Sequence, residues 1–123
     1  MQSTKTLDLG FAQFEIYDNV IVSIIAEGTE FKKEHLDIFH ATFKNVFGDN
    51  KFVYISNRKN SYSVNPTFYV QYEELQNMIG YAVVCDTKSK YNAALFEKHF
   101  YKRPFEVFLQ LNNALSWANK LLE

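Results

Sequence analysis

The feature that most constrains this fold is an alternation along the chain between two hydrophobic patterns. Short runs rich in Val, Ile, Phe and Tyr are typical of β-strands, whereas longer stretches with apolar residues three or four positions apart are typical of α-helices. We predict strands at residues 11–17, 20–25, 52–55, 81–85 and 105–108. We predict helices at residues 36–47, 66–79, 91–101 and 111–122.

Each predicted helix has an apolar stripe, and two have clear boundary signals. Gly48 follows the first stripe where a left-handed C-cap favours glycine, and Asn65-Pro66 provides an N-cap and a first-turn proline for the second helix. The third helix is expected to bury Leu95, Phe96, His99 and Phe100. Between these elements, Asp18-Asn19 is a turn signal that joins the first two strands into an antiparallel hairpin.

Strands that alternate with helices of this length form crossover units, and crossovers produce parallel strands covered by helices. We therefore predict an α/β fold with the element order β-β-α-β-α-β-α-β-α. The sheet is expected to be five-stranded and mainly parallel, with an antiparallel N-terminal hairpin and four helices. A chain of 123 residues fits one domain, so residues 1–123 are assigned to a single domain.

Composition excludes several function classes. A formal net charge of −1 is against nucleic-acid binding, which needs a strong basic excess. The only cysteine is Cys85, so we expect no internal disulfide and no cysteine-based zinc cluster. We find neither a signal peptide nor an apolar run long enough to span a membrane, and expect a cytoplasmic protein.

Three stretches resemble the SpoIIAA-like family of STAS domains, and more distantly SEC14-type lipid carriers. They read FVYISNRKNSYSVNP at 52–66, YAVV at 81–84, and RPFEVF at 103–108 leading to ALSW at 114–117. They are most similar to a flavobacterial-type branch of STAS/SEC14 proteins, and the likeness covers nearly the whole chain. The resemblance implies a SpoIIAA-like fold and a regulatory module without catalytic activity.

The same resemblance implies a phosphorylation site after the third strand. Family members that antagonise anti-sigma factors carry an Asp-Ser-Ser-Gly-like motif there, and a partner kinase phosphorylates its serine. The corresponding residues 60–64 read NSYSV, so Ser61 and Ser63 are the candidate phosphoacceptors, but the acidic residue and the glycine are absent.

Basic residues follow two predicted strands where ligands commonly bind in open α/β sheets, at the carboxyl ends. Arg58 and Lys59 follow the third strand, and Lys88 and Lys90 follow the fourth. With two helix N-termini directed at the same edge, they predict a rim that attracts a small anion or an acidic partner. Ordinary solvated loop charge, with Arg58 in a structural hydrogen bond, is the alternative. The predicted contact residues are Arg58, Lys59, Asn60, Ser61, Tyr62, Ser63, Lys88 and Lys90.

Catalysis finds little support in the sequence. His35 and His40 lie five positions apart and so face different sides of a helix, and both His40 and His99 are interpreted as core residues. Cys85 ends a predicted buried strand and is interpreted as a structural thiol. We therefore predict no enzyme activity, no metal site and no cofactor.

Aromatic residues make up 17% of the chain, which leaves three interpretations open. The rings could fill the core, form a homodimer face, or line a cleft for an amphipathic or lipid ligand. The leading hypothesis is a non-enzymatic STAS-like module that binds a protein partner or a small anion through the loop after the third strand. The alternative is a SEC14-like carrier of a small amphipathic or lipid ligand.

Overall fold

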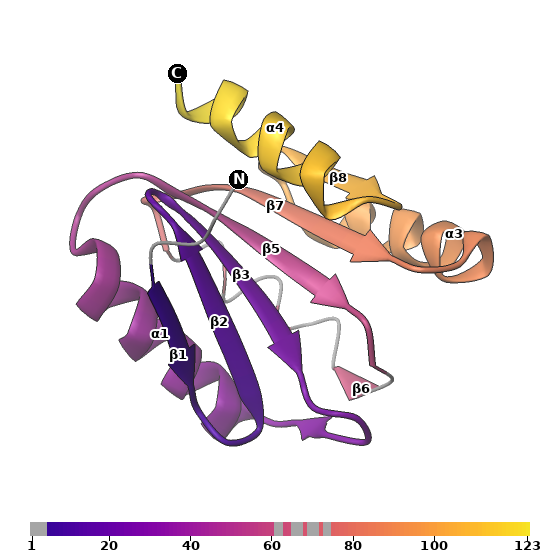
Figure 1. Ribbon diagram of the computed structural model, residues 1–123, viewed down its shortest axis with the longest axis horizontal. Coiled ribbons are helices and arrows are strands. Elements are labelled where there is room, and N and C mark those ends of the chain that lie inside the picture. Colours follow the sequence, from indigo (N-terminus) through magenta and orange to yellow (C-terminus); the bar gives the residue numbers. More distant parts are fainter. Residues whose placement is uncertain (1–4, 61–62, 65–67, 69–71, 73–74) are drawn as a thin grey trace.

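The computed structural model describes residues 5–60, 63–64, 68, 72 and 75–123. Its main feature is a six-stranded sheet in the order β1-β2-β3-β5-β7-β8 (Figure 1). The strands are β1 (Lys5–Asp8), β2 (Ala12–Tyr17), β3 (Val20–Ile25), β5 (Phe52–Arg58), β7 (Met78–Cys85) and β8 (Phe105–Phe108). Strands β1, β2 and β3 are antiparallel to one another, whereas β3, β5, β7 and β8 are parallel.

The strands lie in the sheet in the same order as in the sequence. Each new parallel strand is added beside the previous one, so the crossovers all run in one direction across the sheet. Because crossovers are right-handed, a constant direction places their connecting segments on the same face. The helices α1 (Lys33–Phe47) and α3 (Lys88–Glu97) accordingly pack on one face, and α4 (Leu111–Leu122) covers the other (Figure 1).

The face under α1 and α3 is packed mainly with aromatic rings. Phe39 is fully buried there, between rings from the sheet and from its own helix. The aromatic members of this cluster are Phe14, Phe31, Phe39, Phe43, Phe47, Phe52, Tyr54, Tyr72, Tyr81, Tyr101 and Phe105. Most of the aromatic content of the chain is therefore explained by its core.

The α4 face is packed instead with small and aliphatic side chains. Its cluster contains Val20, Val22, Val53, Ile55, Ala82, Val84, Ala114, Leu115 and Ala118. Gly80 in β7 allows the end of α4 to approach closely, because a Cβ there would lie 2.5 Å from a terminal methyl carbon of Leu121. Small residues on both elements thus allow one short helix to cover the central strands.

A second, two-stranded sheet lies beside the carboxyl end of the main sheet. It pairs β4 (Glu30–Phe31) with β6 (Ser63–Val64) in parallel. Both strands are too short for a recognisable sequence pattern. This pairing ties the chain that leaves β5 to the segment between β3 and α1.

The sequence prediction is confirmed for the hairpin, the parallel strands and the α/β class. It is wrong by one strand in the main sheet, because β1 was not predicted. The second predicted helix falls mostly on residues outside the described part of the chain. Phe68 and Tyr72, which are described, have helical backbone, but Ile79 belongs to β7. The described residues contain three α-helices and one short 3₁₀ helix, η1 (Lys98–Phe100).

The third helix also differs from its prediction. It begins earlier, at Lys88, with Thr87 as N-cap: the Thr87 hydroxyl accepts a hydrogen bond from the Lys90 backbone N–H at 3.2 Å. Lys88 and Lys90 therefore belong to its first turn and not to a loop. None of the helices described here is both long and apolar enough to cross a membrane.

Candidate functional site

The predicted basic residues do gather at one edge of the sheet. Strands β5 and β7 are parallel, and Arg58 at the end of β5 pairs in register with Cys85 at the end of β7. Helix α3 begins only three residues after Cys85, so Lys88 and Lys90 lie at this same carboxyl edge.

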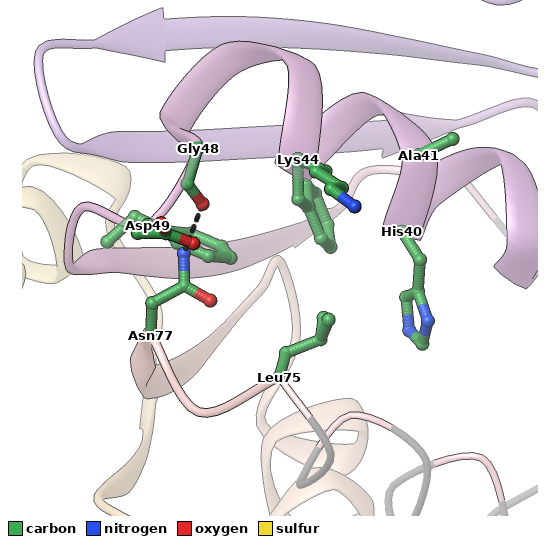
Figure 2. A pocket seen from close by; sticks show the side chains of 9 residues that line it. His40, Ala41, Lys44, Gly48, Asp49, Leu75 and Asn77 are labelled. Carbon is green, nitrogen blue, oxygen red and sulfur yellow. Dashed lines mark hydrogen bonds between the residues drawn. The ribbon is translucent and has the colours of Figure 1, made fainter.

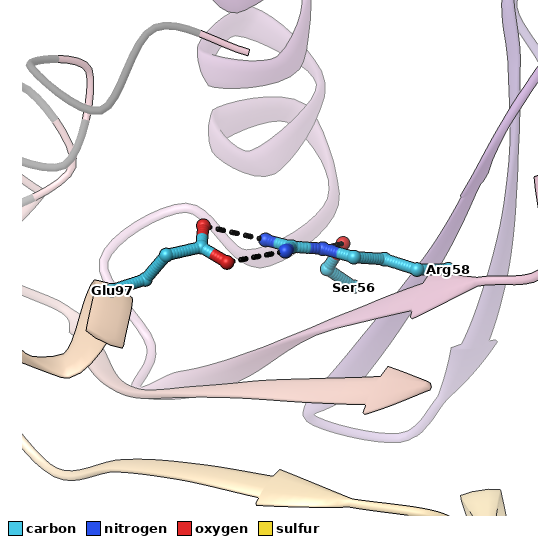
Figure 3. A network of polar contacts seen from close by, with 3 residues as sticks. All are labelled: Ser56, Arg58 and Glu97. Carbon is cyan, nitrogen blue, oxygen red and sulfur yellow. Dashed lines mark hydrogen bonds and ion pairs between the residues drawn. The ribbon is translucent and has the colours of Figure 1, made fainter. Parts of the chain in front are cut away.

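At this edge, Arg58 is held by an acidic residue of the chain itself. Its Nη1 and Nη2 atoms donate to the two carboxylate oxygens of Glu97 at 2.5 and 3.0 Å, and its Nε donates to the Ser56 hydroxyl at 3.3 Å (Figure 3). The Arg58 and Glu97 side chains are only 18% and 15% exposed. The guanidinium N–H groups that could have bound an anion therefore donate to Glu97 instead, and we assign Arg58 a structural role.

Other predicted contact residues also make internal contacts. The Asn60 side-chain amide donates to the Ile25 carbonyl oxygen at 3.0 Å, which ties the loop after β5 to the end of β3. Lys90 pairs with Asp86 at 3.1 Å, an exposed contact that lowers the pKa of the Asp86 carboxyl. Lys59 and Lys88 are exposed. Ser63 lies on β6, whereas Ser61 and Tyr62 lie outside the described residues.

The strand order explains why we expect no ligand-binding crevice at this edge of the sheet. In open α/β sheets, ligands bind where the strand order reverses and neighbouring crossovers separate to opposite faces. The parallel strands here follow one another without a reversal, in the order β3-β5-β7-β8. The described strands therefore form no switch point, and the carboxyl edge loses the main geometric reason for placing a small anion there.

Candidate catalytic groups have structural surroundings as well. Burial raises the pKa of the Cys85 thiol, and the nearby Arg58 guanidinium offsets only part of that rise. His35 accepts a hydrogen bond at Nδ1 from the Lys32 backbone N–H at 2.8 Å, which caps α1. The described residues include no group of three or more His, Cys, Asp or Glu side chains that could hold a metal ion.

A cavity of about 320 Å³ lies at the opposite pole, beside the amino end of β5 (Figure 2). Phe43, Phe52 and Leu75 provide its apolar lining. Its polar lining comes from His40, Lys44, Asp49 and Asn77. His40, predicted as a core residue, is half-buried here, with its ring 5.5 Å from that of Tyr72.

The Asn77 side chain fixes one wall of this cavity. Its amide nitrogen donates to the carbonyl oxygen of Gly48 at 3.0 Å (Figure 2) and to that of Asn50 at 2.9 Å, which joins the turn after α1 to the start of β7. No pattern in the sequence indicates this contact, because Asn77 lies 29 and 27 positions from Gly48 and Asn50.

Among the described residues, the most exposed large apolar side chain lies on α3. Phe96 is 64% exposed, and Leu95 and Phe100 are each 37% exposed. Phe96 contacts the rings of Phe100 and His99 at centroid distances of 5.8 and 5.6 Å. We call Leu95, Phe96, His99 and Phe100 the α3 surface. These four residues were predicted to be buried, and that prediction is wrong.

Comparisons with protein-family models, curated proteins and solved structures gave no match. The function must therefore be inferred from the residues of the chain itself.

The inward face of α3 explains why the prediction failed. Ala94 is buried on that face, Tyr101 is buried just beyond η1, and Glu97 reaches Arg58. A small residue lets the helix lie close to β7 and β8, and the ion pair fixes its rotation. Ala94, Glu97 and Tyr101 have a helical spacing that could have indicated the buried side. These residues are, however, less apolar than Leu95, Phe96, His99 and Phe100, which were predicted to be buried.

Proposed function

We propose that this chain is a non-enzymatic binding module that contacts a macromolecular partner through the α3 surface. The observation that carries this proposal is the exposure of Phe96, together with Leu95 and Phe100, in a chain that buries most of its other large apolar side chains. Contiguous exposed apolar groups mark interaction sites, and aromatic residues are enriched at the centres of interfaces. The α3 surface is the natural centre of such a contact.

The loop after β5 is the second part of this proposal. It starts at the same edge of the sheet, and Lys59 is exposed there. Lys59, Ser61, Tyr62 and Ser63 remain candidates for the border of the contact, and phosphorylation of Ser61 or Ser63 would add charge to it. A regulatory module of STAS type would act through such a protein contact, which is the role that the family resemblance implies.

Site-specific photocrosslinking in the host cell tests the contact. A photoreactive phenylalanine analogue in place of Phe96 is expected to give a discrete crosslinked product, because an interface centre lies within reach of the probe. Ile38 on α1 and Leu109 after β8 are also exposed apolar residues and serve as matched control positions. The proposal fails if the probe at position 96 gives no product or only the products seen at the control positions.

A second function is favoured by the cavity beside α1. Its apolar lining and its mixed polar groups suit a small amphipathic ligand, as in the carrier hypothesis. Tyr54, Tyr81 and Tyr101, however, are buried core residues and do not line it. A carrier of this kind would therefore use Phe43 and Phe52 as its apolar contacts.

Native mass spectrometry of protein purified from its host tests the carrier function. A co-purifying small molecule is expected for the original chain and not for the Ala41→Trp variant, because an indole at that position would fill the cavity from α1. The Ile38→Trp variant is the matched control, since Ile38 is exposed on the same helix and does not line the cavity. A bare chain in all three samples would rule out the carrier.

A further inference from the structure

The cavity beside α1 combines an apolar interior with a charged border. Phe43 and Phe52 line it and are almost completely buried, whereas Lys44 and Asp49 line it and are exposed. Its volume of about 320 Å³ is at the lower end of the range for small-molecule sites, which is roughly 300–1,000 Å³. The cavity therefore suits a small molecule with one apolar group, and not a lipid with long acyl chains.

The two charges at this border are not paired with each other or with another described side chain. Ion pairs with N–O distances up to 4 Å form elsewhere, as between Lys33 and Asp37 on the same helix, but neither Lys44 nor Asp49 takes part in one. A ligand between Lys44 and Asp49 therefore meets an ammonium group and a carboxylate that it does not have to displace from internal partners.

Asn77 adds a hydrogen-bond acceptor at the same end of the cavity as Asp49. Its amide nitrogen donates to the carbonyl oxygens of Gly48 and Asn50, the residues on either side of Asp49. Because both partners are acceptors, the nitrogen must face them, and the Oδ1 atom points away from Gly48 on the side of Leu75 (Figure 2). The negative end of the α1 dipole lies here as well. This end of the cavity thus favours a cationic group.

Lys44 favours an anionic group at a separate place along the same wall. It lies one helical turn before Gly48, in the direction of His40 (Figure 2). A ligand with only a negative charge would face repulsion from Asp49, and a ligand with only a positive charge would face repulsion from Lys44. A molecule that carries both charges matches both residues.

We propose that this cavity binds a small zwitterion with an apolar side chain, of the class of the apolar α-amino acids. The inference rests on the carrier function proposed above and adds the chemistry of the ligand. It does not depend on the α3 surface. The carboxylate of the ligand contacts Lys44, its ammonium group contacts Asp49 and the Oδ1 atom of Asn77, and its side chain packs against Phe43 and Phe52.

NMR titration with L-phenylalanine and two analogues that each lack one charge tests the inference. Hydrocinnamate lacks the ammonium group, and phenethylamine lacks the carboxylate. Phenylalanine is expected to shift the amide signals of residues 40–49 and 75–78. It is also expected to bind at least about 3-fold more tightly than either analogue, which is the size of effect that one exposed charge contact gives.

Two variants assign the charges to their residues. Lys44→Gln is expected to weaken the binding of phenylalanine by about 3-fold and not to weaken that of phenethylamine. Asp49→Asn is expected to weaken the binding of phenylalanine by a similar factor and not to weaken that of hydrocinnamate. General damage to the cavity would instead weaken all three ligands. Lys33→Gln and Asp37→Asn change exposed charges of α1 outside the cavity and should bind like the original chain.

The outcomes separate the zwitterion from the carrier function. If either analogue binds as tightly as phenylalanine, or if Lys44→Gln and Asp49→Asn change nothing, the zwitterion is wrong. The cavity then still stands as a ligand site if Ala41→Trp abolishes binding. If none of the three molecules binds, or the shifts map outside the cavity, the zwitterion is overturned, and native mass spectrometry decides the carrier function separately. Binding of dodecanoate in preference to phenylalanine would support a lipid carrier and overturn the zwitterion.

Discussion

The Phe39→Ala variant is expected to lose about 3–5 kcal/mol of its free energy of unfolding. Phe39 is fully buried in the aromatic face of the core, so its removal leaves a cavity that neighbouring rings fill poorly. Its ring lies 4.7–6.2 Å, centroid to centroid, from those of Phe11, Phe14, Phe31, Phe43 and Tyr54. Domains are typically stable by only about 5–15 kcal/mol, so this single change approaches unfolding.

Chemical denaturation followed by circular dichroism measures this loss. The matched control is Phe96→Ala, which removes an equally large ring from an exposed position. That variant is expected to change stability by less than about 0.5 kcal/mol, as is usual for surface substitutions. Equal losses at the two positions would mean that Phe96 is not the exposed side chain described above.

The second large effect is expected for Glu97→Ala, which leaves the Arg58 guanidinium buried without its carboxylate. Removing one partner of a fully buried ion pair costs about 3–5 kcal/mol. Because these side chains keep some exposure to solvent, we expect a loss of about 2–3 kcal/mol in the free energy of unfolding, by comparison with that range. Arg58→Ala should be destabilising for the same reason.

A double variant separates the ion pair from simple packing. Arg58→Met combined with Glu97→Leu replaces both charges with apolar groups, and such replacements are often neutral. The double variant should therefore recover most of the stability that Glu97→Ala loses, as measured by the same denaturation experiment. If Arg58→Ala leaves stability unchanged and instead abolishes binding of phosphate, Arg58 is an anion-binding residue and the structural role is wrong.

The fold class could be predicted from the sequence because buried strands and helix stripes have distinct patterns. β7 and the first four residues of β5 are continuous runs with almost no polar side chain, as is typical of parallel strands covered on both faces. β1 was missed because it is an edge strand that is mostly exposed, so its residues are mainly polar. β4 and β6 were missed because a strand of two residues has no periodicity.

The candidate site was harder to predict because it depends on contacts between distant segments. Arg58 and Glu97 are 39 positions apart, and only the packing of α3 beside β5 and β7 brings them together. The sequence showed the basic residues at the correct edge but not the acid that neutralises one of them. The rotation of α3 was likewise undetermined, since its more apolar stripe is the exposed one.

The strand order has a consequence for how this chain could fold during synthesis. Since no strand is inserted between two earlier ones, each can pair with the sheet edge already present as it leaves the ribosome. Helix α4 is the last of these elements to emerge, and until then the side chains of β3 and β5 that it covers, Val20, Val22, Val53 and Ile55, are open to water. The interval before α4 docks is therefore when a nascent chain would most need a chaperone.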